Sequence, residues 1–136
     1  MNRMQCLFLF LFLPAMKLNA TVWVVNQNGT GNFRLIQEAI NNPGALSGDT
    51  IFLAPSVHFE QGINNAGKSL TFLGAGYDVS MIIGGSFSLT QGSHRMSGIR
   101  VTGGVLCSIC DSIVITSTVA VFGVHDVGDL VIVNRS

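Results

Sequence analysis

The sequence predicts an all-β fold, a short parallel β-helix of about four to six coils that begins with a single α-helix. One helical stretch occurs near the start, at residues 33–41, and from residue 49 onward short strand-like runs follow one another without a second helical period. Several runs are continuously apolar, as in TIFLA (50–54), which is typical of parallel strands buried on both faces. A solenoid of same-direction strands accounts for both observations.

The first twenty residues have the pattern of a secretory signal peptide. Arg3 supplies the positive charge, LFLFLFL (7–13) is a short apolar stretch, and Ala20 offers a small residue for cleavage before Thr21. A membrane span needs about 20 apolar residues, so a run this short predicts no span. We therefore expect export, to the extracellular space or the cell surface, and one β-helix domain over residues 21–136.

Charge argues against nucleic acid as a partner. Beyond residue 20 the chain carries five basic and seven acidic residues, a net charge of −2, with no basic cluster. Only 10% of the whole chain is charged, against about 25% in typical domains. Such a chain buries surface easily and has few charges to keep its own surface apart from others.

The expected elements begin with a strand at residues 21–25, followed by a loop and the helix. Asn32 is the predicted N-cap. The apolar stripe of the helix consists of Leu35, Ile36, Ala39 and Ile40. Asn41-Asn42-Pro43-Gly44 ends the helix, because proline cannot continue the hydrogen-bond ladder.

The later strands are predicted from short β-branched and apolar runs bounded by turn residues. They cover residues 49–54, 68–74, 80–85, 86–91, 97–104, 111–118, 119–124 and 129–134. Comparison of SLTFLG, GIRVTG, SIVITS and DLVIVN gives coil spacings of 29, 14 and 17 residues, so no strict period exists. A β-sandwich is the alternative, but no Asn-Gly or Asp-Gly turn joins neighbouring runs.

Three segments resemble the N-terminal part of the pectin lyase-like superfamily, which includes pectinesterases and pectate lyases. They are GTGNFRLIQEAIN (29–41), GDTIFLAPSVHFEQ (48–61) and KSLTFLGAGYDVSMIIGG (68–85). The resemblance covers about residues 22–104. It implies a right-handed parallel β-helix in which the short helix caps the first coil, as the terminal repeats of solenoids require.

The C-terminal end is still strand-like in DLVIVNRS (129–136). An open strand edge invites pairing. We expect either further coils of a longer protein or a stacking partner at that end.

Cys107 and Cys110 form a C-x-x-C pair that has two interpretations, a redox or disulfide pair and two separate buried side chains. The flanking residues read as a strand, in which positions i and i+3 face opposite sides unless a turn intervenes. The sequence therefore favours two unbonded cysteines.

Enzymes of the superfamily imply carboxylates, an arginine base or bound calcium, but none of their motif strings occurs here. The remaining catalytic candidates are Arg100, Asp111 and Asp126. Arg100 stands between Ile99 and Val101, so it should face outward if they face the core. Asp126 and Asp129 are candidates for calcium, although two carboxylates fall short of its 6–8 oxygen ligands.

His94-Arg95 is interpreted as a solvated turn, with a cationic contact to an anionic sugar as the alternative. The functional expectation is an exported β-helix module without its own catalysis, structural or associated with polysaccharide. The alternative is a lyase or esterase acting on acidic cell-wall sugars.

Overall fold

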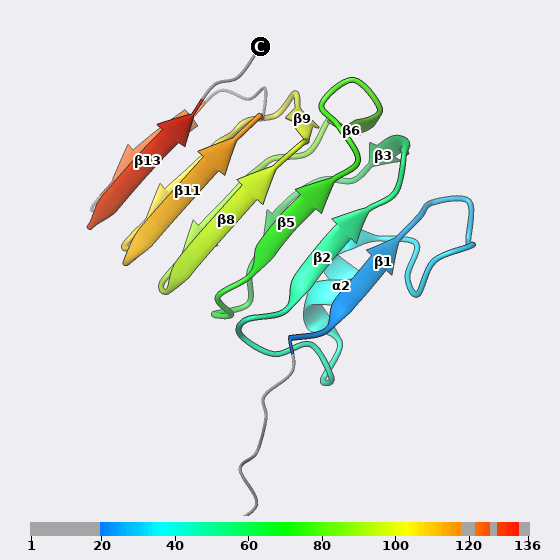
Figure 1. Ribbon diagram of the computed structural model, residues 1–136, viewed down its shortest axis with the longest axis horizontal. Helices are drawn as coiled ribbons and strands as arrows, with labels where there is room; N and C mark the ends of the chain where they lie inside the picture. The colour runs from blue at the N-terminus through cyan, green and yellow to red at the C-terminus, as the bar shows by residue number, and fades with distance from the viewer. Residues whose placement is uncertain (1–19, 118–121, 126–127, 134–136) are drawn as a thin grey trace, which may run out of the picture.

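The structure is a computed structural model that describes residues 20–117, 122–125 and 128–133. It is a solenoid of about three turns in which each described strand pairing is parallel. Figure 1 shows the strands stacked side by side along the long axis of the molecule. The prediction of a parallel β-solenoid is confirmed, and the hairpin-linked sandwich is not observed in the described part of the chain.

Three sheets run along the solenoid. The six-stranded sheet contains, in order, β1 (Val22–Val25), β2 (Thr50–Leu53), β5 (Thr71–Gly74), β8 (Ser93–Ser97), β11 (Ser112–Thr116) and β13 (Asp129–Val133). The three-stranded sheet contains β3 (Ser56–Phe59), β6 (Ser80–Ile83) and β9 (Arg100–Val101). The four-stranded sheet contains β4 (Ile63–Asn64), β7 (Phe87–Thr90), β10 (Val105–Ser108) and β12 (Phe122–His125). The chain visits the three sheets in turn, so β2-β3-β4, β5-β6-β7 and β8-β9-β10 are three successive coils.

The coils differ in length. In the six-stranded sheet Ile51 pairs with Phe72, Phe72 with Met96, and Met96 with Ile115, so successive coils take 21, 24 and 19 residues. The predicted spacings of 29 and 14 residues are wrong, because GIRVTG belongs to β9 in another sheet. The equivalent run is SHRMS (93–97), whose polar residues do not look like a strand facing a core.

The core fills the space between the sheets. The paired residues Ile51, Phe72, Met96 and Ile115 point inward from the six-stranded sheet and are fully or almost fully buried. Phe72 meets Phe87 of the four-stranded sheet edge to face, with ring centroids 5.0 Å apart. Removing these side chains from water is the main force that holds the coils together.

Glycines mark one corner of the coils, where the chain leaves the three-stranded sheet for the four-stranded one. A Cβ atom on Gly85 would collide with the carbonyl oxygen of Glu60 in the previous coil. A Cβ atom on Gly103 would collide with the carbonyl oxygen of Gly85 in the same way. The backbones of successive coils therefore approach at this corner only because no side chain intervenes.

The helix α2 (Ile36–Asn41) is shorter than the sequence predicts. Its N-cap residue is Leu35, so the prediction that Asn32 caps the helix is wrong. Leu35 is 36% exposed, so it is not part of the buried stripe. The Asn32 side-chain oxygen instead accepts a hydrogen bond from the Val24 amide. Ile36, Ala39 and Ile40 are buried as expected, and the helix contacts β1, β2 and β4.

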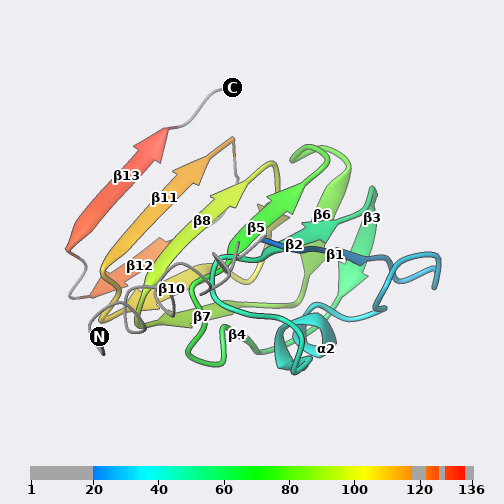
Figure 2. The same cartoon turned by 60° about the horizontal axis from the view of Figure 1, so that its bottom comes forward.

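Two charged side chains from the first full coil, Glu60 and Lys68, hold the two ends of α2. The Glu60 carboxylate accepts hydrogen bonds from the amides of Ile36 and Gln37, each at 2.7 Å. The Lys68 ammonium donates to the carbonyl oxygens at the other end of the helix, those of Ile40 and Asn42. An anion at the N-terminus and a cation at the C-terminus both complement the helix dipole. Figure 2 shows the helix beside β4, at the β1 end of the solenoid.

Within the described residues, no helix has the length and apolar character needed to cross a membrane.

Candidate functional site

The outer face of the six-stranded sheet has a polar depression at its middle. The depression has a volume of about 310 Å³ and is lined by Thr71, Ser93, His94, Arg95, Ser112 and Val114. These residues come from three adjacent strands, β5, β8 and β11. The site is therefore built across three coils, with one lining residue from β5, three from β8 and two from β11.

Strand alternation sets which side chains face the depression. On β8, His94 and Met96 are buried in the core, whereas Ser93 and Arg95 are exposed. The interpretation of His94-Arg95 as a solvated turn is wrong, because both residues lie within β8.

Residues that pair across neighbouring strands form rows on the outer face of the sheet, and hydroxyl groups lie in the rows on both sides of Arg95. In one row Ser93 pairs with Ser112, and the Ser69 hydroxyl accepts a hydrogen bond from the Ser93 amide at 3.1 Å. In the other row the Thr116 hydroxyl donates to the Ser97 hydroxyl at 2.9 Å. Adjacent strands lie about 4.8 Å apart, so the rows present hydroxyls at a regular spacing on either side of the guanidinium.

Thr71 and Val114 complete the row that contains Arg95 itself. Asp129, at the beginning of β13, pairs with Ser112 in the neighbouring row. Arg95 forms no ion pair with any described residue. Its positive charge is therefore free for a ligand.

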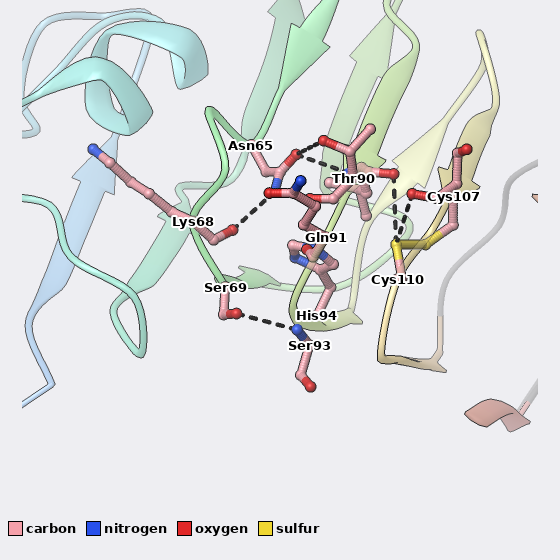
Figure 3. Close-up of a disulfide and its surroundings, with 11 residues drawn as sticks. Asn65, Lys68, Ser69, Thr90, Gln91, Ser93, His94, Cys107 and Cys110 are labelled. Atoms are coloured by element: carbon pink, nitrogen blue, oxygen red, sulfur yellow. Dashed lines mark hydrogen bonds between the residues drawn. A yellow bond between two sulfur atoms is a disulfide. The ribbon is translucent and has the colours of Figure 1, made fainter. Parts of the chain in front are cut away.

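His94 lies beneath the depression with its imidazole in the core. Its Nε2 contacts the carbonyl oxygen of Gln91 at 2.7 Å, while Nδ1 is buried without a hydrogen-bond partner among the described residues. Burial lowers the pKa of His94, although hydrogen bonds to backbone carbonyls and the nearby Asp111 charge oppose the shift. The ring is neutral at pH 7 and packs in the core beneath β8. It is therefore not placed to contact an anionic sugar. Figure 3 shows His94 and Ser93 on β8 beside the hydrogen-bonded Asn65 and Thr90.

Arg100 lies in the three-stranded sheet, away from the depression. Ile99 and Val101 are buried, so the expectation that Arg100 faces outward is confirmed. Its guanidinium forms an ion pair with Asp78 at 3.3 Å and lies 5.9 Å from the centre of the Tyr77 ring. Arg100 is therefore already engaged within its own sheet.

The predicted aspartates that the structure describes, Asp111 and Asp129, are not gathered with Arg100. Asp111 is exposed in the turn between β10 and β11, where its amide donates to the Gly92 carbonyl and its own carbonyl accepts from Asp129. Asp129 is the first residue of β13, and Asp126 lies outside the described residues. No group of three or more His, Cys, Asp or Glu side chains suited to a metal ion occurs in the part of the chain that the structure describes.

Cys107 and Cys110 form a disulfide, so the prediction that they are unbonded is wrong. Cys107 is an inward-facing residue of β10. Two residues later, Ile109 adopts a left-handed conformation with φ of +57°. This intervening turn brings both sulfurs to the same side, and both cysteines are buried. Figure 3 shows the bond beside the Thr90 strand.

Sequence reasoning missed the hydroxyls at Thr71, Ser93 and Ser112. The signal that could have found them is the strand register. If SHRMS is aligned with SLTFL of the previous coil and SIVIT of the next, Arg95 lies between Thr71 and Val114. Short polar strands of this kind become recognisable only when their neighbours in the stack are known.

The chain matches no known protein-family model, no curated protein and no solved structure.

Proposed function

We propose that the chain is an exported, non-catalytic β-helix module that binds an acidic polysaccharide on its six-stranded sheet. The observation that carries the proposal is Arg95, a cation exposed in the middle of a sheet between two rows of hydroxyls. A guanidinium presents paired N–H donors that match a carboxylate, here the carboxylate of a uronic acid. Serine and threonine hydroxyls both donate and accept, as contacts to sugar hydroxyls require.

The shape of the site supports a polymer as the ligand. The depression spans three strands and lies on the outside of the solenoid. Small-molecule pockets usually enclose most of the ligand surface. An open, stepped surface instead suits a chain that lies along the stack and contacts several coils.

The finer features of the fold belong to the same proposal. We infer a right-handed β-helix of the pectin lyase-like type whose N-terminal end is capped by α2. The support is the resemblance of residues 29–41, 48–61 and 68–85, together with the hold of Glu60 and Lys68 on the helix ends. The buried face of Ile36, Ala39 and Ile40 would shield the first coil from water. At the opposite end, β13 would pair with further coils or a stacking partner.

The disulfide supports export. Disulfides persist in oxidising compartments and are rare in the cytosol. The Cys107–Cys110 bond and the apolar leader at residues 7–13 are independent features that favour the same location. We accordingly place the protein outside the cell or at its surface.

The proposal is tested by binding to polygalacturonate at low ionic strength, measured by isothermal titration calorimetry. Arg95→Ala should weaken binding at least tenfold, the loss of about 1.4 kcal/mol expected for one charge-assisted contact. Arg100→Ala removes the same charge from the three-stranded sheet and should change affinity less than twofold. Equal losses in the two variants would indicate unspecific attraction, and absent binding would refute the proposed ligand.

The alternative, a lyase or esterase, is tested with the same substrate. Formation of unsaturated product or release of methanol would be followed with and without calcium. Turnover that Arg100→Ala, Asp111→Ala or Asp126→Ala abolishes would replace the binding function with catalysis.

A further inference from the structure

A buried carboxylate lies at the start of the solenoid, next to the first described residues. Asp49 is only 4% exposed. One carboxylate oxygen accepts hydrogen bonds from the Trp23 indole at 2.9 Å and the Leu46 amide at 3.0 Å. The other oxygen accepts from the backbone nitrogen of Thr21 at 2.9 Å.

Asp49 is charged at neutral pH. Burial raises the pKa of this carboxyl group, but the hydrogen bonds from Leu46, Thr21 and Trp23 and the charge of Lys68 outweigh burial and hold the pKa below its usual value. Asp49 forms no ion pair with any described residue. All hydrogen bonds to this buried charge come from neutral donors, and a cation in direct contact with it would reduce the cost of burying it.

Thr21 is the residue that follows the predicted cleavage point. Its carbonyl oxygen accepts a hydrogen bond from the Thr50 amide at 2.9 Å, so its backbone is fixed beside β2. Ala20 and Thr21 are both exposed residues. Cleavage of the Ala20–Thr21 bond would therefore free the same backbone nitrogen that donates a hydrogen bond to Asp49.

We propose that signal peptidase hydrolyses the Ala20–Thr21 bond and that the new α-ammonium group of Thr21 forms a salt bridge with Asp49. Hydrolysis adds one water molecule, leaves a carboxylate on Ala20 and leaves the ammonium on Thr21. The released leader carries the Ala20 carboxylate away. A neutral hydrogen bond then becomes a charge-assisted one at the same atoms, so processing itself stabilises the first strand.

The position of the new terminus is decisive. Consecutive Cα atoms lie about 3.8 Å apart, so a chain that began one residue earlier or later would hold its ammonium away from the Asp49 oxygen. The inference rests on the export part of the proposed function and is independent of polysaccharide binding.

The first test is the N-terminal sequence and intact mass of the protein exported from a host that expresses the full gene. We expect residues 21–136. The second test is an NMR titration of the Thr21 α-amino group in that protein. Its pKa should exceed the ordinary range of about 7.7–8.0 by one unit or more. A terminus at another residue, or a pKa within the ordinary range, would overturn the proposal.

A third test compares the exported protein with a matched chain that carries one additional alanine before Thr21. Both chains keep the entire described core, which begins at Val25. The folding equilibrium constant of the exported protein should be about tenfold larger at pH 7, which corresponds to the one-unit pKa shift. Because a raised amine pKa stabilises below the unfolded pKa, the advantage should disappear as pH rises through the folded pKa.

A difference that persists at high pH, or no difference at pH 7, would contradict the salt bridge. Asp49→Asn should remove the pH-dependent difference, and if that variant does not fold, the NMR titration of the unchanged protein still decides. Polygalacturonate binding is measured on the same exported protein, so failure of the ligand and failure of the terminus are separate results.

Discussion

Glu60→Ala tests whether α2 is held from outside the helix, by a residue of the first full coil. The substitution removes both 2.7 Å hydrogen bonds to the amides of Ile36 and Gln37. Loss of an N-cap acceptor costs about 1–2 kcal/mol, and loss of the favourable charge at the helix N-terminus about 0.5–1 kcal/mol. We therefore expect the free energy of unfolding to fall by about 2–3 kcal/mol.

Glu60→Gln keeps one acceptor oxygen and removes the charge, so it should cost about 1 kcal/mol. Glu38→Ala is the matched control, because Glu38 is an exposed carboxylate in the helix itself, and its cost should stay below about 0.5 kcal/mol. Urea denaturation followed by circular dichroism gives these values from the midpoint and slope. Equal losses for Glu60→Ala and Glu38→Ala would refute the assignment of Glu60 as the cap.

Further substitutions and a pH series test other parts of the structure. Phe72→Ala should cost about 3–5 kcal/mol because it empties a fully buried position and ends the contact with Phe87. Phe52→Ala, on the outward side of β2, should cost less than half as much in the same urea titration, and comparable costs would contradict the assigned register. Replacement of both Cys107 and Cys110 by alanine should cost about 2 kcal/mol, the entropy of closing a short loop, measured against the oxidised protein, and an unchanged midpoint would argue against the bond. Burial lowers the pKa of His58 and His94, with hydrogen bonds to backbone carbonyls in opposition. Because the folded pKa values lie below the unfolded value of about 6.5, stability should be full above that pH and decline as pH falls through the folded values. Urea midpoints between pH 8 and pH 5 measure this decline, and a flat profile would show that these histidines take up protons equally well in the folded state.

The apolar strands could be predicted from the sequence because each buries a short run of large side chains. TIFLA became β2, and its continuous apolar character correctly predicted parallel pairing. SIVIT, predicted as a strand, became β11. The strand β8 was missed because one of its two inward side chains is His94, a polar residue that looks like part of a turn. The coil spacing was misread for the same reason.

Other features depended on contacts between distant residues. The N-cap rule examines neighbours in sequence, and it selected Asn32, whereas the acceptor is Glu60 in the next coil. The disulfide required a left-handed turn at Ile109, an exposed isoleucine that sequence rules do not associate with this conformation. The site around Arg95 depends on register, which sets the neighbours of a strand residue and varies here with coil length.

The most direct measurement of the central claim is an amide and side-chain NMR titration of the protein with a short oligogalacturonate. Binding on the six-stranded sheet predicts shifts at Thr71, Arg95 and Ser112, on three adjacent strands. The resonances of Tyr77 and Arg100 on the three-stranded sheet should stay unchanged. Shifts confined to the three-stranded sheet, or no shifts at all, would contradict the assignment of the polysaccharide site to Arg95 and its flanking hydroxyls.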